Sequence, residues 1–440
     1  MTTENRNQVL GLAVALALAV SLTSCAIHPR GEREERERAH VAYVKAVPEP
    51  LAADASLEQI LEYAYQANAD LERLYWEWIA ALETIPQEAS PGTNLAFSVE
   101  SMFEEGKTSL SRTTLGVGND PMSNLPWPGK LSTAGARSLE QARAAGFRFQ
   151  AGKLELRARV LDAYYAYALL AETLRLKQRE ASLLEIAADA TEGPVRAGTA
   201  SANELLMAQN QRDLTVNDLE NLKAKVPGSL AGLNALLGRE ATAQLDLPRE
   251  LPAARDLPYT DREILGFLAE RNPELAALAH EAAANEQAVK MARQQYLPDL
   301  GLAASSDLDG IMQSLMVMIT APLVRHEAIE ASISQAQAEL EASLAMRRQA
   351  EQDLTAQAVL ALYDLRNAER QIALFETTLI PRLAQTVETT HKAFAVGRAS
   401  LVDVVEARQM LLKMRIMAAE MRMERESMLA KIESLAVISG

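Results

Sequence analysis

The chain of 440 residues has very few of the residues from which catalytic and metal sites are built. It contains 1 Cys and 5 His, and no two histidines lie within one helical turn of each other. These counts exclude a disulfide framework, a multi-cysteine metal site and a zinc site of the HExxH type. We also find no nucleophile–base set and no phosphate-binding loop. We therefore expect no enzyme, no catalytic residues, no metal site and no cofactor.

Positive charge and aromatic residues are also scarce. The formal net charge is −15, and the chain holds 7 Phe and 3 Trp. Nucleic acid is not expected as a partner, because DNA binding needs a basic face. Ala and Leu, both good helix formers, carry the apolar content. This composition favours a mainly helical protein.

The only long apolar run, from Val9 to Val20, is too short to cross a bilayer as a helix, which needs about 20 residues. It fits the apolar region of a signal peptide. Four residues after this run resemble a bacterial lipobox: Leu22, Thr23, Ser24 and Cys25. Cleavage before Cys25 would free its thiol for lipidation, for example with palmitate. Ala26 follows where an Asp often retains a lipoprotein at the inner membrane, so the outer membrane is favoured. The alternative is a plain signal peptide, or an anchor in which the Cys falls by chance.

The mature chain repeats itself once, and the repeat sets the expected domains. Each half has a helix, a strand hairpin, a very long helix, a glycine tip and a returning helix. We assign 1–24 to the signal peptide, 25–55 to a lipidated N-terminal tether, 56–237 to the first structural repeat, 238–260 to an equatorial connection rich in proline, and 261–440 to the second repeat.

The first repeat is expected to open with a helix from Ser56 to about Ile85, followed by two strands whose apolar residues alternate. A helix from about Leu131 to Ala190 comes next, and at 1.5 Å per residue it is roughly 90 Å long. The second repeat has matching strands near 300–304 and 314–320. Its long helix reaches the 390s and is interrupted at Pro381.

Two stretches match between the halves. Asn68-Ala69-Asp70-Leu71 corresponds to Asn272-Pro273-Glu274-Leu275, and the tip Gly198–Ala208 aligns without a gap with Gly397–Ala407. Four strands cannot close a barrel, and an open sheet in lipid would leave unpaired edges. We therefore expect oligomerisation, since three chains would supply twelve strands. The long helices carry small apolar residues and need partners along their length.

With these features the chain resembles the TolC-type outer membrane efflux protein family over nearly all of its mature length. The residues that carry the resemblance are the duplicated Asn motifs, Tyr296-Leu297-Pro298-Asp299, the exit Ala321-Pro322-Leu323, and the glycine tips. The run Leu125-Pro126-Trp127-Pro128-Gly129-Lys130 also resembles the metal-efflux-associated branch around CusC and CzcC.

The resemblance implies a fold that is mainly α with a small β part: a duplicated long-helix coiled coil or α-barrel, with two β-hairpins contributing to a trimeric 12-stranded outer-membrane β-barrel. It implies a homotrimer, anchored in the outer membrane by lipid, with a long periplasmic extension. Its partners would be a periplasmic adaptor (membrane fusion) protein and an inner-membrane pump of the resistance-nodulation-division type. The chain would then be the passive exit duct of a tripartite efflux system.

The family pattern also implies site residues. Asp403 and Glu406 lie at i and i+3 on one helix face and would form two acidic rings at the periplasmic gate of a trimer. Repulsion within such rings would raise some of their pKa values. Glu204 and Arg398 are candidates for a latch, although the family's basic position falls on Ala399. Gly198 and Gly397 would form the tips that contact the adaptor.

Other readings remain open. The acidic pair could be a solvated helix face, and the glycines could serve only the backbone. A methionine stripe is expected to pack a helix seam rather than bind soft metal ions; it comprises Met410, Met414, Met417, Met421 and Met428. The alternative to a duct is a lipid-anchored periplasmic coiled-coil structural protein.

Overall fold

The computed structural model describes residues 26–43, 49–90, 94–104, 107–118, 127–196, 201–307, 313–322 and 324–438. The described chain forms two compact units. The sheet unit comprises Met1–Tyr43, Leu74–Phe149 and Glu274–Ala350, and the hairpin unit comprises Val44–Arg73, Gln150–Pro273 and Glu351–Gly440. Each unit takes residues from both sequence repeats, so packing divides the chain differently from the repeat.

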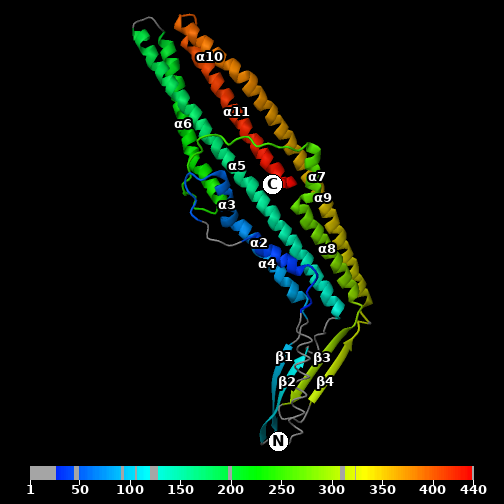
Figure 1. The fold of residues 1–440 in the computed structure, drawn as a ribbon. Helices are drawn as coiled ribbons and strands as arrows, with labels where there is room; N and C mark the ends of the chain where they lie inside the picture. The colour runs from blue at the N-terminus through cyan, green and yellow to red at the C-terminus, as the bar shows by residue number, and fades with distance from the viewer. Residues whose placement is uncertain are drawn as a thin grey trace. The chain divides into compact units, whose positions relative to one another are not determined.

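The order of elements within each repeat follows the prediction (Figure 1). A short helix, α2 (Glu32–Ala42), precedes the repeats. The first repeat contains α3 (Leu57–Ala67), α4 (Ala69–Glu88), α5 (Pro128–Arg196) and α6 (Ala202–Leu236). The second contains α7 (Asp261–Arg271), α8 (Pro273–Gln294), α9 (His326–Leu374), the π-helical turn η1 (Phe375–Leu379), α10 (Ile380–Ala395) and α11 (Leu401–Ala436). Among the described helices, none combines the length and apolar character needed to cross a membrane.

The sheet unit contains one antiparallel sheet in the order β1-β2-β3-β4 (Figure 1). Its strands are β1 (Asn94–Glu104), β2 (Lys107–Gly118), β3 (Asp299–Asp307) and β4 (Gln313–Thr320). The hairpins of the two repeats join where β2 pairs with β3, with Thr114 opposite Asp307 and Gly118 opposite Ala303. Strands β1 and β4 therefore form the two edges of the sheet within one chain.

The predicted helix from Ser56 to Ile85 is wrong as a single helix, because Asn68 divides it into α3 and α4. Asn68 is extended, with φ −71° and ψ 118°, and ends α3. Its side-chain oxygen accepts hydrogen bonds from the backbone N–H groups of Asp70 and Leu71 and so caps α4. Its amide nitrogen donates to the carbonyl of Leu236, at the end of α6, over 2.9 Å. A single residue thus serves three helices, α3 through its backbone and α4 and α6 through its side chain.

The second repeat builds the same joint. Asn272 ends α7, and its amide nitrogen donates to the carbonyl of Leu435 near the end of α11 over 2.9 Å. The helices that precede the joints also begin alike, since Ser56 and Thr260 both form capping boxes. The sequence duplication is therefore a structural duplication as well.

The predicted role of small apolar residues is confirmed in the sheet unit. Ala142 and Ala144 of α5 are buried. On α9, Ile333, Ala336 and Leu340 pack against Val289 and Ala292 of α8. Small side chains let these helices approach closely, and this approach builds layers of long helices.

The charged residues that follow the lipobox form a short helix with ion pairs, one of the two forms that such a charged tether can take. They form α2, whose Glu32 and Glu35 are buried although the segment is rich in charge. Arg36 joins the two helices, because it donates to Glu32 of α2 over 2.9 Å and to Glu83 of α4 over 2.6 Å. The N-terminal segment is therefore docked on the sheet unit.

Candidate functional site

The second glycine tip, between α10 and α11, adopts a backbone conformation that favours glycine. Gly397 has φ +72°, in the left-handed region that other residues enter at a cost. Its N–H donates to the carbonyl of Phe394 over 2.9 Å, and the N–H of Arg398 donates to that of Ala393 over 2.8 Å. This pattern is a Schellman motif, which closes α10 and lets the chain reverse.

The acidic pair lies directly after this turn, at the start of α11. Asp403 forms a capping box with Ser400: its Oδ2 accepts from the backbone N–H over 2.7 Å and from the hydroxyl over 2.8 Å. The backbone hydrogen bond from Ser400, followed by the hydroxyl, lowers the pKa of Asp403. This effect within one chain opposes the rise expected from repulsion between chains. Glu406, one turn later, is exposed.

The sequence reading of Asp403 missed this structural role. The signal was present, because a Ser followed three residues later by an acid at the start of an apolar helix is a capping box. An acidic residue at position 403 is therefore explained by capping of the α11 N-terminus as well as by a role in a gate.

The first tip is only partly described. Gly198, like the lipobox residues Leu22, Thr23, Ser24 and Cys25, lies outside the described residues. Ser201 caps α6, accepting from the backbone N–H of Asn203 over 3.2 Å. The side chain of Glu204 is also outside the described part, and Arg398 is exposed. The Glu204–Arg398 latch therefore stays a prediction.

An antiparallel contact, the α5–α11 seam, joins the two helical hairpins within the hairpin unit, and α6 also contacts α11. Leu161 and Ala168 of α5 cluster with Met423 and Ala430 of α11. Nearer the tips, Ala188 of α5 packs against Leu401 of α11. Residues with higher numbers on α5 therefore cluster with residues of lower number on α11. The two helices run antiparallel, and their contact is mostly apolar.

At its end farthest from the tips, the seam is closed by a charged network centred on Arg255. This residue belongs to the connection between the repeats, and its Nε donates to Glu426 of α11 over 3.0 Å. Its Nη1 reaches Glu433 over 2.8 Å, and Arg157 of α5 reaches the same carboxylate over 2.6 Å. Burial acts to lower the pKa of Arg255, but Tyr165 and the two carboxylates, Glu433 and Glu426, outweigh burial and raise it. The connection is therefore bound to both long helices of the seam.

The methionine stripe is partly covered within a single chain, because Met414, Met417, Met421 and Met428 are half-buried. Met410 is 51% exposed, and the buried methionine of α11 is Met423, which is outside the stripe. The expected packed seam is thus wrong for Met410 within one chain. Within the described residues there is no group of three or more His, Cys, Asp or Glu that could hold a metal ion.

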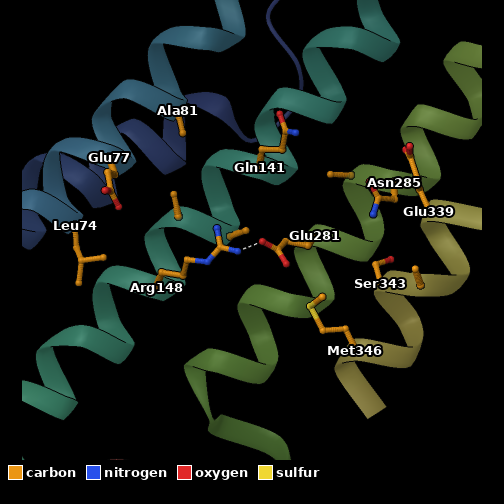
Figure 2. Close-up of a pocket in the computed structure, with 14 residues that line it drawn as sticks. Leu74, Glu77, Ala81, Gln141, Arg148, Glu281, Asn285, Glu339, Ser343 and Met346 are labelled. Atoms are coloured by element: carbon orange, nitrogen blue, oxygen red, sulfur yellow. Dashed lines mark ion pairs between the residues drawn. The ribbon is translucent and has the colours of Figure 1, made fainter. Parts of the chain in front are cut away.

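The sheet unit contains an open cavity of about 680 Å³ between α4, α5, α8 and α9 (Figure 2). Arg148 of α5 and Glu281 of α8 point toward each other and form an ion pair. Glu77 and Glu339 stand on opposite sides, on α4 and α9. Three carboxylates and one guanidinium give this cavity an acidic character that favours cations. Sequence reasoning missed it because its residues come from four separate helices.

The junction between the helices and the sheet is also built from both repeats. Lys130 of α5 donates to Asp299 Oδ1 over 2.7 Å and to the carbonyl of Leu297 over 3.0 Å. Near the N-terminus, the N–H of Ile27 donates to the carbonyl of Ala89 over 3.1 Å. Ala89 follows α4, five residues before β1 starts. The segment that follows Cys25 is thus held beside the beginning of the sheet.

Comparison with known proteins places these features in a family. The sequence model of the outer membrane efflux protein family matches residues 124–239 and 265–436. The match covers both long-helix hairpins and more than half of the chain. The chain therefore belongs to the outer membrane efflux protein family. No curated protein matches the sequence.

Solved structures share the fold. The CmeC outer membrane channel of Campylobacter jejuni superposes with a TM-score of 0.75 at 14% identity, over 89% of this chain and 90% of that chain. The open state of the MtrE outer membrane channel of Neisseria gonorrhoeae gives 0.73 at 16% identity, over 94% and 98%. CusC gives 0.74 at 16% identity, over 94% and 99%. These similar values do not separate the CusC/CzcC branch, so that assignment stays a prediction.

The family and the fold together confirm the reading of this chain as an outer-membrane efflux protein with the architecture of a channel-tunnel. The alternative, a lipid-anchored periplasmic coiled-coil structural protein, is not favoured, because it needs neither the sheet nor the paired hairpins.

Proposed function

We propose that three copies of this chain form the passive exit duct of a tripartite efflux system, taking cargo from an inner-membrane pump through a periplasmic adaptor. The observation that carries this proposal is the single antiparallel sheet built from the hairpins of both repeats. Its two edges, β1 and β4, are unpaired within one chain, and an open edge is not tolerated in lipid. Pairing β1 of one copy with β4 of the next closes the sheet and satisfies both edges.

The hairpin unit supports the same assembly. Helix α10 is amphipathic, yet it has no buried residue within one chain. Its apolar residues recur at three- and four-residue spacing and include Ile380, Leu383 and Val387. A neighbouring copy packed on α10 would cover this face. The family resemblance implies a pump of the resistance-nodulation-division type, which would supply the energy for transport through a passive duct.

The lipid anchor belongs to this proposal. The Ile27–Ala89 hydrogen bond holds the chain only two residues after Cys25, beside the start of β1. A lipid on Cys25 would then enter the membrane next to the sheet. Cys25→Ser removes the thiol. We expect the variant to lose its lipid in an intact-mass measurement and still assemble, whereas an unchanged mass would refute lipidation at Cys25.

The periplasmic gate would be formed by Asp403 and Glu406. Around a three-fold axis they give two stacked rings of acids, which attract cations and repel anions. Their position directly after the Gly397 turn places them at the end of the hairpin. Gly198 and Gly397 would form the surface that meets the adaptor, with Glu204 and Arg398 as a latch between the tips.

Single-channel conductance of the purified, lipidated protein in a planar bilayer tests the duct and the gate together. The variant Asp403→Asn/Glu406→Gln removes both charges, while the amide that replaces the Asp403 carboxylate keeps an oxygen that can accept from Ser400. We expect a small, cation-selective current that divalent cations block in the wild type, and a larger current without block in the variant.

Two results would contradict these assignments separately. If the double variant carries the same current as the wild type, the duct is supported, but Asp403 and Glu406 do not form the gate. A folded oligomer that carries no current would remove the duct itself and favour a structural coiled coil.

A further inference from the structure

The α5–α11 seam contains one residue that breaks its apolar character near the tips. On α5, Leu184 and Ala188 are buried, as are Val404 and Leu401 on α11. Glu180 lies one turn before Leu184 and is only 7% exposed. A carboxylate in this position is costly unless it is paired and hydrogen-bonded.

Glu180 is poorly satisfied there. Its Oε1 is buried and has no hydrogen-bond partner among the described residues. Burial raises the pKa of Glu180, while the charges of Arg408 and then Lys177 act in the opposite direction. These two cations come from the two sides of the site, since Arg408 is on α11 and Lys177 is on α5.

Two other cations near this level pair with acids of α6. Lys177 donates to Asp218 of α6 over 2.8 Å. Arg212 of α6 binds Asp213 over 2.8 Å; it also faces Glu185 and Asp189 of α5. Arg408 is thus the cation of the opposite hairpin that compensates Glu180.

We propose that Glu180 and Arg408 set how firmly the two helical hairpins of one chain hold together, and so how readily the periplasmic end of the duct opens. The two residues are not equivalent. Glu180 is only 7% exposed, whereas Arg408 is half-buried and can be hydrated when it has no partner. Loss of Arg408 removes the larger of the two cationic influences on a buried charge, but loss of the Glu180 charge leaves a cation that water can solvate.

This asymmetry gives opposite predictions for two variants. Glu180→Gln keeps the size of the side chain and removes the enclosed charge, so the seam holds more firmly and the duct opens less. Arg408→Gln leaves Glu180 charged with only Lys177 to offset that charge, so the seam loosens and the duct opens more. Protonation of Glu180 at acid pH acts like Glu180→Gln, and the wild-type duct therefore closes as the pH falls.

The inference rests on the proposed duct, so the test has two arms. The first is open probability in a planar bilayer between pH 8 and pH 5. We expect it to fall roughly 5-fold in Glu180→Gln and to rise roughly 5-fold in Arg408→Gln, the lower end of the usual range for coupling between sites. The pH dependence of Glu180→Gln should be smaller than that of the wild type. Glu185→Gln, an exposed acid on the same helix, is the matched control and should behave like the wild type.

The second arm is the thermal unfolding midpoint of the same variants, which does not need a current. It should rise in Glu180→Gln and fall in Arg408→Gln. Shifts in the same direction for both variants, or no difference from Glu185→Gln, would overturn the proposal while leaving the duct intact. A wild-type protein that carries no current would contradict the proposed function. The thermal unfolding midpoints would still show whether the Glu180 charge destabilises the seam.

Discussion

Arg255 donates its Nε to Oε2 of Glu426 over 3.0 Å, and this contact fastens the connection between the two repeats to α11. The side chain of Glu426 is only 2% exposed, so its charge depends on protein partners rather than on water. Arg425 is a second partner, at 2.5 Å. The connection is therefore a structural part of the hairpin unit rather than a loose linker.

We predict that Arg255→Met destabilises the protein. A buried charge left wholly unpaired costs about 3–5 kcal/mol, and because Arg425 remains bound to Glu426 we expect about 2 kcal/mol. Thermal unfolding followed by circular dichroism measures the change. Arg249→Met, an exposed position in the same connection, should have almost no effect. The double variant Arg255→Met/Glu426→Leu should recover most of the loss, and equal destabilisation in the single and double variants would show that charge pairing is not the cause.

We predict opposite effects for alanine at two glycines. Gly397→Ala forces a Cβ into left-handed backbone at φ +72°, at a cost of about 1–2 kcal/mol. Gly266→Ala, inside α7 with open space around it, should stabilise its helix by about 0.5–1 kcal/mol. Hydrogen exchange of amides in the tip and in α7 detects both changes. Unchanged exchange around the tip in Gly397→Ala would mean that the Schellman turn tolerates a side chain.

We predict that Gly146→Ala destabilises the sheet unit. A Cβ at this position would lie 2.7 Å from Cε2 of Trp78, which is 2% exposed and cannot move without disturbing its neighbours. Overpacking of this kind costs about 1–3 kcal/mol. Thermal unfolding is the measurement, and Gly228→Ala in α6, where no atom lies within 4 Å, is the control. Adding Trp78→Phe should relieve part of the loss; if it does not, the clash is elsewhere.

We predict an acid-dependent loss of stability from Glu140. Burial alone would raise its pKa. The hydrogen bond with His280 at 2.6 Å and the charges of Arg143 and His280 outweigh burial and lower the pKa below 4.5. A carboxylate with a lowered folded pKa stabilises the protein at pH above its unfolded value. That stability is lost as the pH falls through the folded value.

The free energy of unfolding of Glu140→Gln should accordingly be lower than that of the wild type at pH 7, and should fall less steeply below pH 4.5. Urea unfolding between pH 7 and pH 3 gives both quantities. Glu155→Gln, an exposed acid on the same helix, should follow the wild-type curve. Parallel curves for Glu140→Gln and the wild type would show that Glu140 titrates normally.

Much of the fold could be predicted because it is periodic. Apolar and polar residues alternate in the strands around Leu95 and Leu300, and apolar residues recur at helical spacing along the long helices. These patterns predict which elements exist and whether each is a strand or a helix. The repeat then fixed the order of elements, and the tip at Gly397 was found because a left-handed turn needs a glycine. The division at Asn68 was missed because an Asn inside an apolar pattern looks like an ordinary polar position until its carbonyl partner on α6 is known.

The sequence alone determined the helical class, the duplication, the two hairpins and the acidic residues beside the tip, because each depends on spacing between residues that are neighbours along the chain. Only the tertiary structure decided which charges are buried and which helices compensate them. Glu180 and Arg408 are far apart in sequence, and the same holds for Arg255 and Glu426 and for Arg148 and Glu281. The energy of such a charge depends on how much water and which partners surround it, and both are set when distant helices meet.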